Sequence, residues 1–299
     1  MPRQRMYYLG RVQKLGELSE ASLVRALQSA TTIEANNYAW TFTDVVLGGN
    51  VSSPEYVFGY LSKFRPEGVV RAVDRERGIR EEHPEPDLLV ESSPFVYVPA
   101  FSGIAYQHVW NAIEREVFAR RFKDLVEGAF DRFFVGCGIE PIADLRSFVA
   151  RLRALEKITE ISAKVHPPNP LFGRAWKDLR DYLRRRATAE LAVREKGTEN
   201  TPIRTAVLQH LMGLLEQTDS IPYEPGEPVD LPDAALLMAM DGYGRGAVHG
   251  LEGSASVTIR TGEMQKSFRF DASPSARELY EEARRVLEGV NRERDLGHV

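Results

Sequence analysis

The chain has 299 residues, of which 43% are hydrophobic and 27% charged, and its formal net charge is −4. This composition is typical of a folded globular protein and excludes disordered and collagen-like chains. The single cysteine, Cys137, excludes a disulfide within the chain and favours a reducing compartment. The length favours two domains, or one large core with appendages.

Membrane and targeting signals are not predicted. The basic N-terminus is followed by Arg11, Lys14 and Glu17, where a signal peptide needs an apolar stretch. The longest uncharged run, residues 92–113, is interrupted by prolines and polar residues, so we expect a hairpin leading into a helix rather than a spanning helix. We therefore expect a cytoplasmic protein.

The first part of the chain, residues 1–109, is predicted to be a mainly β domain with antiparallel strands. Aromatic and β-branched residues predict strands at 6–12, 38–47, 56–64, 69–73, 95–98 and 104–108. Residues 65–68 should form a turn, and the charged stretch 74–87 should be a solvated loop. One helix is expected at 19–33.

The second part, residues 110–220, alternates helices with strands. Helices are expected at 110–134, 144–155, 169–187 and 201–217, and strands at 139–142, 158–165 and 191–193. Asn169 and Pro170 suit the N-cap and first position of the third helix, whose core face should carry Phe172, Trp176, Leu179 and Leu183. This order indicates a compact central α/β module, related to the ferredoxin-like arrangement.

The third part, residues 221–299, should hold a linker, a β-hairpin and a C-terminal helix packed on the rest. Prolines make 221–232 the best linker candidate, although a rigid ordered connection is an equal alternative. Antiparallel strands are expected within 244–270, with 257–259 and 268–270 flanking a turn. Ser273 and Pro274 should open the last helix. The fold class that follows is α+β.

Charge is distributed unevenly along the chain. Residues 1–114 carry a net −3, residues 115–186 a net +6 and residues 199–299 a net −7. A basic surface in the central module would attract phosphates with a strong dependence on salt. An alternative is a solvated ladder of ion pairs made with Asp178 and Asp181. The candidate nucleic-acid-binding residues are Arg120, Arg121, Arg151, Arg153, Arg174, Lys177, Arg180, Arg184, Arg185 and Arg186.

No catalytic motif is found. The phosphate loop GxxxxGK[ST], the nucleophile elbow GxSxG and the zinc patterns HExxH and CxxC are absent, and the six histidines are dispersed. We therefore predict no catalytic residue, no metal site and no cofactor, and we favour a protein that is not an enzyme. Residues 242–246 should make turns before a hairpin, and Cys137 should be a small residue in a tight turn.

Two further motifs have open interpretations. Residues 166–170 could offer free backbone N–H groups to an anion at a helix start, or form a rigid turn with an Asn cap. Glu160 and Lys164 lie on the same face of a strand, which is loosely similar to the carboxylate–lysine pairing of metal-dependent nucleases. Their spacing does not match the usual motif.

Several segments together resemble a known family. Phe95–Val98, the hairpin and long helix after it, residues 158–170 and the Asp241–Gly244 turn are similar to prokaryotic RexA-like phage-exclusion proteins and related defence proteins, over residues 90–270. The resemblance implies a cytoplasmic, dimeric, nucleic-acid-binding sensor that signals infection to a separate effector. It supplies no catalytic residue.

We therefore predict a non-enzymatic sensor or scaffold of an antiviral phage-defence system, which binds DNA or RNA through the basic central module. A first alternative is a metal-dependent nuclease whose carboxylates converge only in the fold. A second is a self-assembling structural protein without nucleic acid, in which the acidic ends pair with the basic middles of neighbouring copies.

Overall fold

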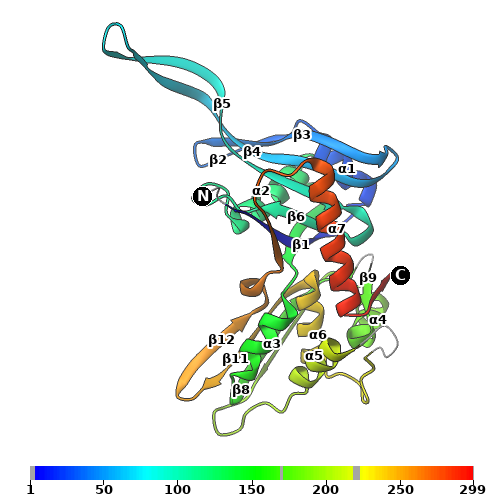
Figure 1. Ribbon diagram of the computed structural model, residues 1–299. Coiled ribbons are helices and arrows are strands. Elements are labelled where there is room, and N and C mark those ends of the chain that lie inside the picture. The colour runs from blue at the N-terminus through cyan, green and yellow to red at the C-terminus, as the bar shows by residue number, and fades with distance from the viewer. Residues whose placement is uncertain (1–3, 169–170, 218–222, 299) are drawn as a thin grey trace.

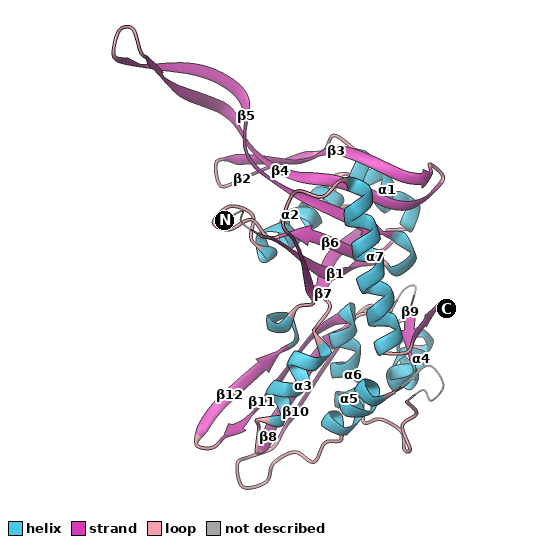
Figure 2. Ribbon diagram, in the orientation of Figure 1, coloured by secondary structure: helices cyan, strands magenta, loops and turns pink. Residues whose placement is uncertain are grey.

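The computed structural model describes residues 4–168, 171–217 and 223–298 (Figure 1). Two antiparallel sheets with helices packed on them lie at opposite ends of the molecule, so the predicted α+β class is confirmed (Figure 2). None of the described helices is long and apolar enough to cross a membrane.

The larger sheet is built around its N-terminal strand. Its order is β13-β1-β6-β5-β4-β3-β2, and β7 also pairs with β1. β13 pairs with the first half of β1 and β7 with the second half, so these two strands lie end to end along one edge. The strands are β1 (Arg5–Gly16), β2 (Thr32–Ala35), β3 (Tyr38–Asn50), β4 (Ser53–Asp74), β5 (Ile79–Val98), β6 (Gly103–Gln107), β7 (Val135–Pro141) and β13 (Ser267–Phe270).

Helices cover both faces of this sheet because its central strands are apolar on both sides. Phe95 and Tyr97 of β5 share a core with Phe122 of α2 (Arg115–Gly128) and with α1 (Glu20–Gln28). Val96, on the opposite face, shares the other core with Leu287 of α7 (Ala276–Glu293). Successive side chains of a strand point to opposite faces, which explains this division.

Strands β4 and β5 extend beyond the sheet as a long two-stranded arm (Figure 1). The predicted turn at 65–68 is therefore wrong, and of the predicted loop at 74–87 only residues 75–78 form a turn, at the tip of the arm. The ladder pairs Arg65 with Leu88 and Glu67 with Pro86, so the pairing continues past Pro66. Because proline has no backbone N–H, Pro66 cannot donate a hydrogen bond at its own position, but the neighbouring pairs are kept. Charge and proline content suggested a loop, but pairing along the neighbouring strand decides the conformation.

The smaller sheet has the order β10-β8-β11-β12. Its strands are β8 (Lys157–Val165), β10 (Leu191–Lys196), β11 (Gly244–Glu252) and β12 (Ala255–Arg260). One face packs against α3 (Leu145–Arg153), α5 (Val207–Glu216) and α6 (Leu231–Met238). α6 was not predicted, because it lies within and just after the proline-rich stretch. Its side chains from Asp233 to Met238 are all buried.

The strands predicted to form one ferredoxin-like module divide between the two sheets, and that grouping is corrected. β7 joins the larger sheet, whereas β11 and β12 from the C-terminal part complete the smaller one. The predicted hairpin of 257–259 with 268–270 is likewise corrected, since β12 pairs with β11 and β13 with β1. Alternating apolar residues mark a strand, but they do not select its partner.

The predicted helices are present with shorter bounds. The helix expected at 169–187 begins later, as η2 (Arg174–Trp176) and α4 (Lys177–Arg185), because β9 (Leu171–Gly173) pairs with β14 (Leu296–His298) first. Trp176, Leu179 and Leu183 are buried as predicted. Asn169, Pro170, residues 221 and 222 of the predicted linker, and the side chain of Phe172 lie outside what the structure describes.

A buried polar junction connects the two sheets. Arg294, the C-cap residue of α7, pairs with Asp241 at 2.8 Å, and Trp176 Nε1 donates to the same carboxylate at 2.7 Å. Arg11 of β1 donates to the backbone carbonyl of Asp241 at 2.6 Å and to Asn291 at 3.1 Å. Strand, helix and turn segments from distant parts of the chain are thereby fixed at one point.

The turn at this junction requires glycine. Gly242 lies in the π-helical turn η3 (Ala239–Tyr243) with a φ of +87°, and a Cβ there would come within 3.0 Å of Arg11 Cγ. Gly244 then begins β11, where a Cβ would lie 2.0 Å from the carbonyl oxygen of Lys164. The predicted turn before a β-hairpin is confirmed, and it brings β11 close against β8.

Candidate functional site

The ten basic residues predicted from the sequence lie on helices at different places in the molecule. Arg120 and Arg121 belong to α2 on the larger sheet, and Arg151 and Arg153 to the last turn of α3 on the smaller one (Figure 1). Arg174, Lys177, Arg180, Arg184, Arg185 and Arg186 lie in η2 and α4 or at its C-cap.

Some of these side chains have fixed partners. Arg121 is buried, pairs with Asp124 at 2.8 Å and lies 5.5 Å from the Trp40 ring. Arg174 pairs with Asp295 at 2.7 Å, and Arg180 with Asp181 at 2.6 Å. The exposed set at the end of α4 is Arg184, Arg185 and Arg186, where cations also stabilise the helix dipole. Nucleic-acid binding and a solvated, structural role both stay open as interpretations of these three arginines.

A second basic surface, which the sequence analysis missed, lies on the smaller sheet. Ile161, Ala163 and Val165 of β8 point to the helices, so Glu160, Ser162 and Lys164 point the other way. We call this outward side the open face. It also carries the side chains of Ala192, Arg194, Lys196, Arg245, Ala247, His249, Thr258 and Arg260.

Strand register brings these cations together. Lys164 pairs directly with Arg245 of β11. In the next row, Arg194 of β10 lies beside Ser162, and Arg260 of β12 terminates the row beyond Ala247. Neighbouring strands are about 4.8 Å apart, so four strands place cations across roughly 14 Å of one surface.

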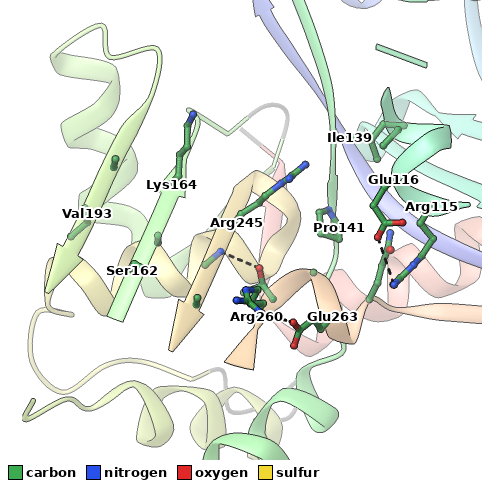
Figure 3. Close-up of a pocket in the computed structure, with 18 of the residues that line it drawn as sticks. Arg115, Glu116, Ile139, Pro141, Ser162, Lys164, Val193, Arg245, Arg260 and Glu263 are labelled. Atoms are coloured by element: carbon green, nitrogen blue, oxygen red, sulfur yellow. Dashed lines mark hydrogen bonds and ion pairs between the residues drawn. The ribbon is translucent and has the colours of Figure 1, made fainter. Parts of the chain in front are cut away.

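A cleft of about 590 Å³ separates the open face from the larger sheet. Figure 3 shows Lys164, Arg245 and Arg260 on the sheet side, with Arg115 and Glu116 of α2 on the opposite wall. The far wall is completed by Tyr106, Ile139 and Pro141 of the larger sheet. The volume lies in the range of ligand-binding clefts, roughly 300–1,000 Å³.

Ion pairs hold the cations of the cleft in place. The pairs are Arg245–Glu140 and Arg194–Glu160 at 2.7 Å, and Lys164–Glu190 and Arg260–Glu263 at 2.8 Å. The four cationic side chains are 58–72% exposed, whereas Glu140 and Glu160 are only 13% exposed. Glu190 and Glu263 are themselves 42% and 52% exposed, so each cation reaches the solvent beside a carboxylate partner.

The neighbouring cations favour the charged form of the Glu160 carboxylate. Hydrogen bonds from Arg194 are the largest cause of its lowered pKa, and Lys196 at 3.4 Å adds to the effect. The pKa of Arg194 is raised by the same pair. The exposed pairs Lys164–Glu190 and Arg260–Glu263 contribute little to stability, so exchanging these carboxylates for a phosphate costs little.

Other predicted features have structural roles. Cys137 lies within β7 rather than in a tight turn, and burial raises the pKa of its thiol, which makes it unreactive. His166 Nδ1 lies 3.2 Å from the carbonyl oxygen of Ala189. Among the described residues, no three His, Cys, Asp or Glu side chains gather closely enough to hold a metal ion.

Comparison with known proteins adds no relative. No protein-family model matches the chain, and no curated protein matches it significantly. The chemistry of the cleft is therefore the basis for assigning a function.

One sequence signal could have indicated the open face. On β8, Lys164 lies between the apolar residues Ala163 and Val165, and on β10 Arg194 follows Val193. The cations of different strands are far apart in the sequence, and only the strand order makes the four strands neighbours.

Proposed function

We propose that this protein is a non-enzymatic nucleic-acid-binding protein, and that the open face of the smaller sheet contacts the phosphate backbone. The observation that carries the proposal is the array of exposed cations on four adjacent strands, with Lys164, Arg194, Arg245 and Arg260 at its centre. Arg and Lys that neutralise several phosphates supply most of the affinity of non-specific nucleic-acid binding.

The extent of the array favours a polymer over a small anion. A single phosphate can engage one or two guanidinium groups, whereas these cations extend across roughly 14 Å. The carboxylates of the cleft are paired with arginine or lysine, and both oxygens of Glu160 accept from Arg194. This pairing favours binding over the metal chemistry of a nuclease.

The biological setting is a further part of the proposal. We propose a cytoplasmic sensor or scaffold in phage defence, acting as a dimer and signalling to a separate effector protein. The support for this setting is the resemblance of residues 90–270 to RexA-like phage-exclusion proteins.

Matched triple variants test the binding surface. Lys164→Gln/Arg245→Gln/Arg260→Gln removes three cations of the open face, and Arg184→Gln/Arg185→Gln/Arg186→Gln removes three from the end of α4. We expect the first variant to lose roughly tenfold or more in affinity for a labelled oligonucleotide, and the second to bind like the wild type. Fluorescence anisotropy measures both.

Thermal unfolding is the control for this experiment, since each variant must fold like the wild type. The proposal is contradicted if the open-face variant binds normally while the α4 variant loses affinity. That result would support the helical residues identified from the sequence instead.

A further inference from the structure

The loop between β6 and α2 exposes a large aromatic side chain. Trp110 is 67% exposed, while the other two tryptophans, Trp40 and Trp176, are buried. The Trp110 ring lies 4.3 Å from the ring of His108 and almost perpendicular to it, at 85°. One side of the indole is therefore supported by protein, and the rest is open to solvent.

His108 is a buried polar group with unused hydrogen-bonding capacity. Its side chain is only 8% exposed, and neither ring nitrogen has a hydrogen-bond partner among the described residues. Burial lowers its pKa, so the ring is neutral near pH 7 and offers one donor and one acceptor. Both ring nitrogens are buried, so His108 acts as an interior support for the exposed indole.

A chain of contacts connects Trp110 to the basic cleft. The ring of His108 packs edge-on against Tyr8 at 5.9 Å, and the guanidinium of Arg115 lies 4.8 Å from the Tyr8 ring. Arg115 also lines the cleft, opposite Lys164 (Figure 3). We call Tyr8, His108, Trp110 and Arg115 the aromatic cluster.

We infer that the aromatic cluster binds an unstacked base of a single-stranded nucleic acid whose phosphates lie on the open face. This inference rests on the proposed function and adds the class of nucleic acid. A base stacks on the exposed indole, which the ring of His108 supports from within the protein. Stacking on aromatic side chains is available only to bases that are not already stacked within a duplex. The protein should therefore prefer single strands.

Intrinsic fluorescence tests the inference directly, because Trp110 is the solvent-exposed tryptophan. We expect an unlabelled single-stranded oligonucleotide to quench the emission, and a duplex of the same sequence to bind with little quenching. In Trp110→Leu the affinity for the single strand should fall about fivefold or more, and in Trp110→Phe much less. Duplex affinity should stay unchanged in both variants.

Two controls sharpen the experiment. Phe134→Leu removes another exposed aromatic side chain, 76% exposed, beyond the opposite end of α2, and should bind like the wild type. An oligonucleotide of abasic sites keeps the phosphates but lacks bases, so wild type and Trp110→Leu should bind it equally.

The inference is overturned if a saturating single strand leaves the emission unchanged, or if Trp110→Leu binds single strands as tightly as the wild type. The proposed function fails by a separate result, namely normal binding of both nucleic-acid forms by Lys164→Gln/Arg245→Gln/Arg260→Gln.

Discussion

Arg11 and Arg294 bring two guanidinium groups into the interior where the two sheets meet, beside the carboxylate of Asp241. Arg11 is fully buried, and Arg294 is 3% exposed. Further acceptors are the backbone carbonyls of Phe101, at 2.7 Å from Arg11, and of Ala143, which accepts from Arg294, together with the side chain of Asn291. Buried charges are tolerated only when they are paired and hydrogen-bonded in this way.

The charge of Asp241 should therefore be important for stability. Asp241→Asn keeps the shape of the side chain but leaves the buried Arg294 without its counter-charge, and we expect a loss of about 3 kcal/mol in the free energy of unfolding. Urea denaturation measures the loss. The matched control is Arg284→Gln, which breaks an exposed pair with Glu288 and should cost under about 0.5 kcal/mol. Equal effects of the two substitutions would contradict this role.

Residues of this junction could not be recognised in the sequence. Arg11 and its acceptor Asp241 are separated by 230 positions, and an isolated arginine in a strand pattern is usually exposed. Local signals were more informative. The glycines at 242 and 244 indicated a turn, and Ser275 with Glu278 forms the capping box of α7, within two residues of the expected helix start.

At the scale of elements, the arm of β4 and β5 differs most from the body of the protein. Val73 and Leu89 on it are 69% and 59% exposed, and Arg71 pairs with Glu82 on its surface. Closer to the body, Tyr56 of β4 stacks on Tyr280 of α7, and the two ring centroids are 4.4 Å apart. A two-stranded ribbon without a covering layer adds little to the stability of a domain.

Shortening the arm should therefore leave the fold intact. We expect replacement of residues 66–87 by an Asn-Gly turn to change Tm by less than about 2 °C, as judged by thermal unfolding. Tyr56→Ala is the contrasting variant, since it removes a ring packed on α7 and should lower Tm by more than about 5 °C. A large fall in Tm for the shortened arm would show that it stabilises the body.

The sequence predicted which segments form regular structure better than how these segments pair. Amphipathic spacing located α1, α2, α3 and α5, and a Ser-Pro start signal located α7, although the ends of these helices differ by several residues. It did not locate α6, which is apolar on nearly all sides because it is buried between the smaller sheet and other helices. Strand partners such as β1 with β13 depend on contacts between the two ends of the chain, and no local pattern encodes them.

For the whole molecule, the fold creates a charge pattern that the linear sequence does not show. The basic block at 115–186 was visible by counting, but the open face also draws on Arg194, Arg245 and Arg260 from outside it. These cations become neighbours only through the order β10-β8-β11-β12. Packing of α3, α5 and α6 on the opposite face then determines which side remains open.

The dependence of the binding constant on salt tests the nucleic-acid interface most directly. Each phosphate contact contributes about 0.7–0.9 to the slope of log K against log salt concentration. We predict that Lys164→Gln/Arg245→Gln/Arg260→Gln lowers the slope by about two to three, and that Arg184→Gln/Arg185→Gln/Arg186→Gln leaves it unchanged. An unchanged slope in the open-face variant would contradict the account.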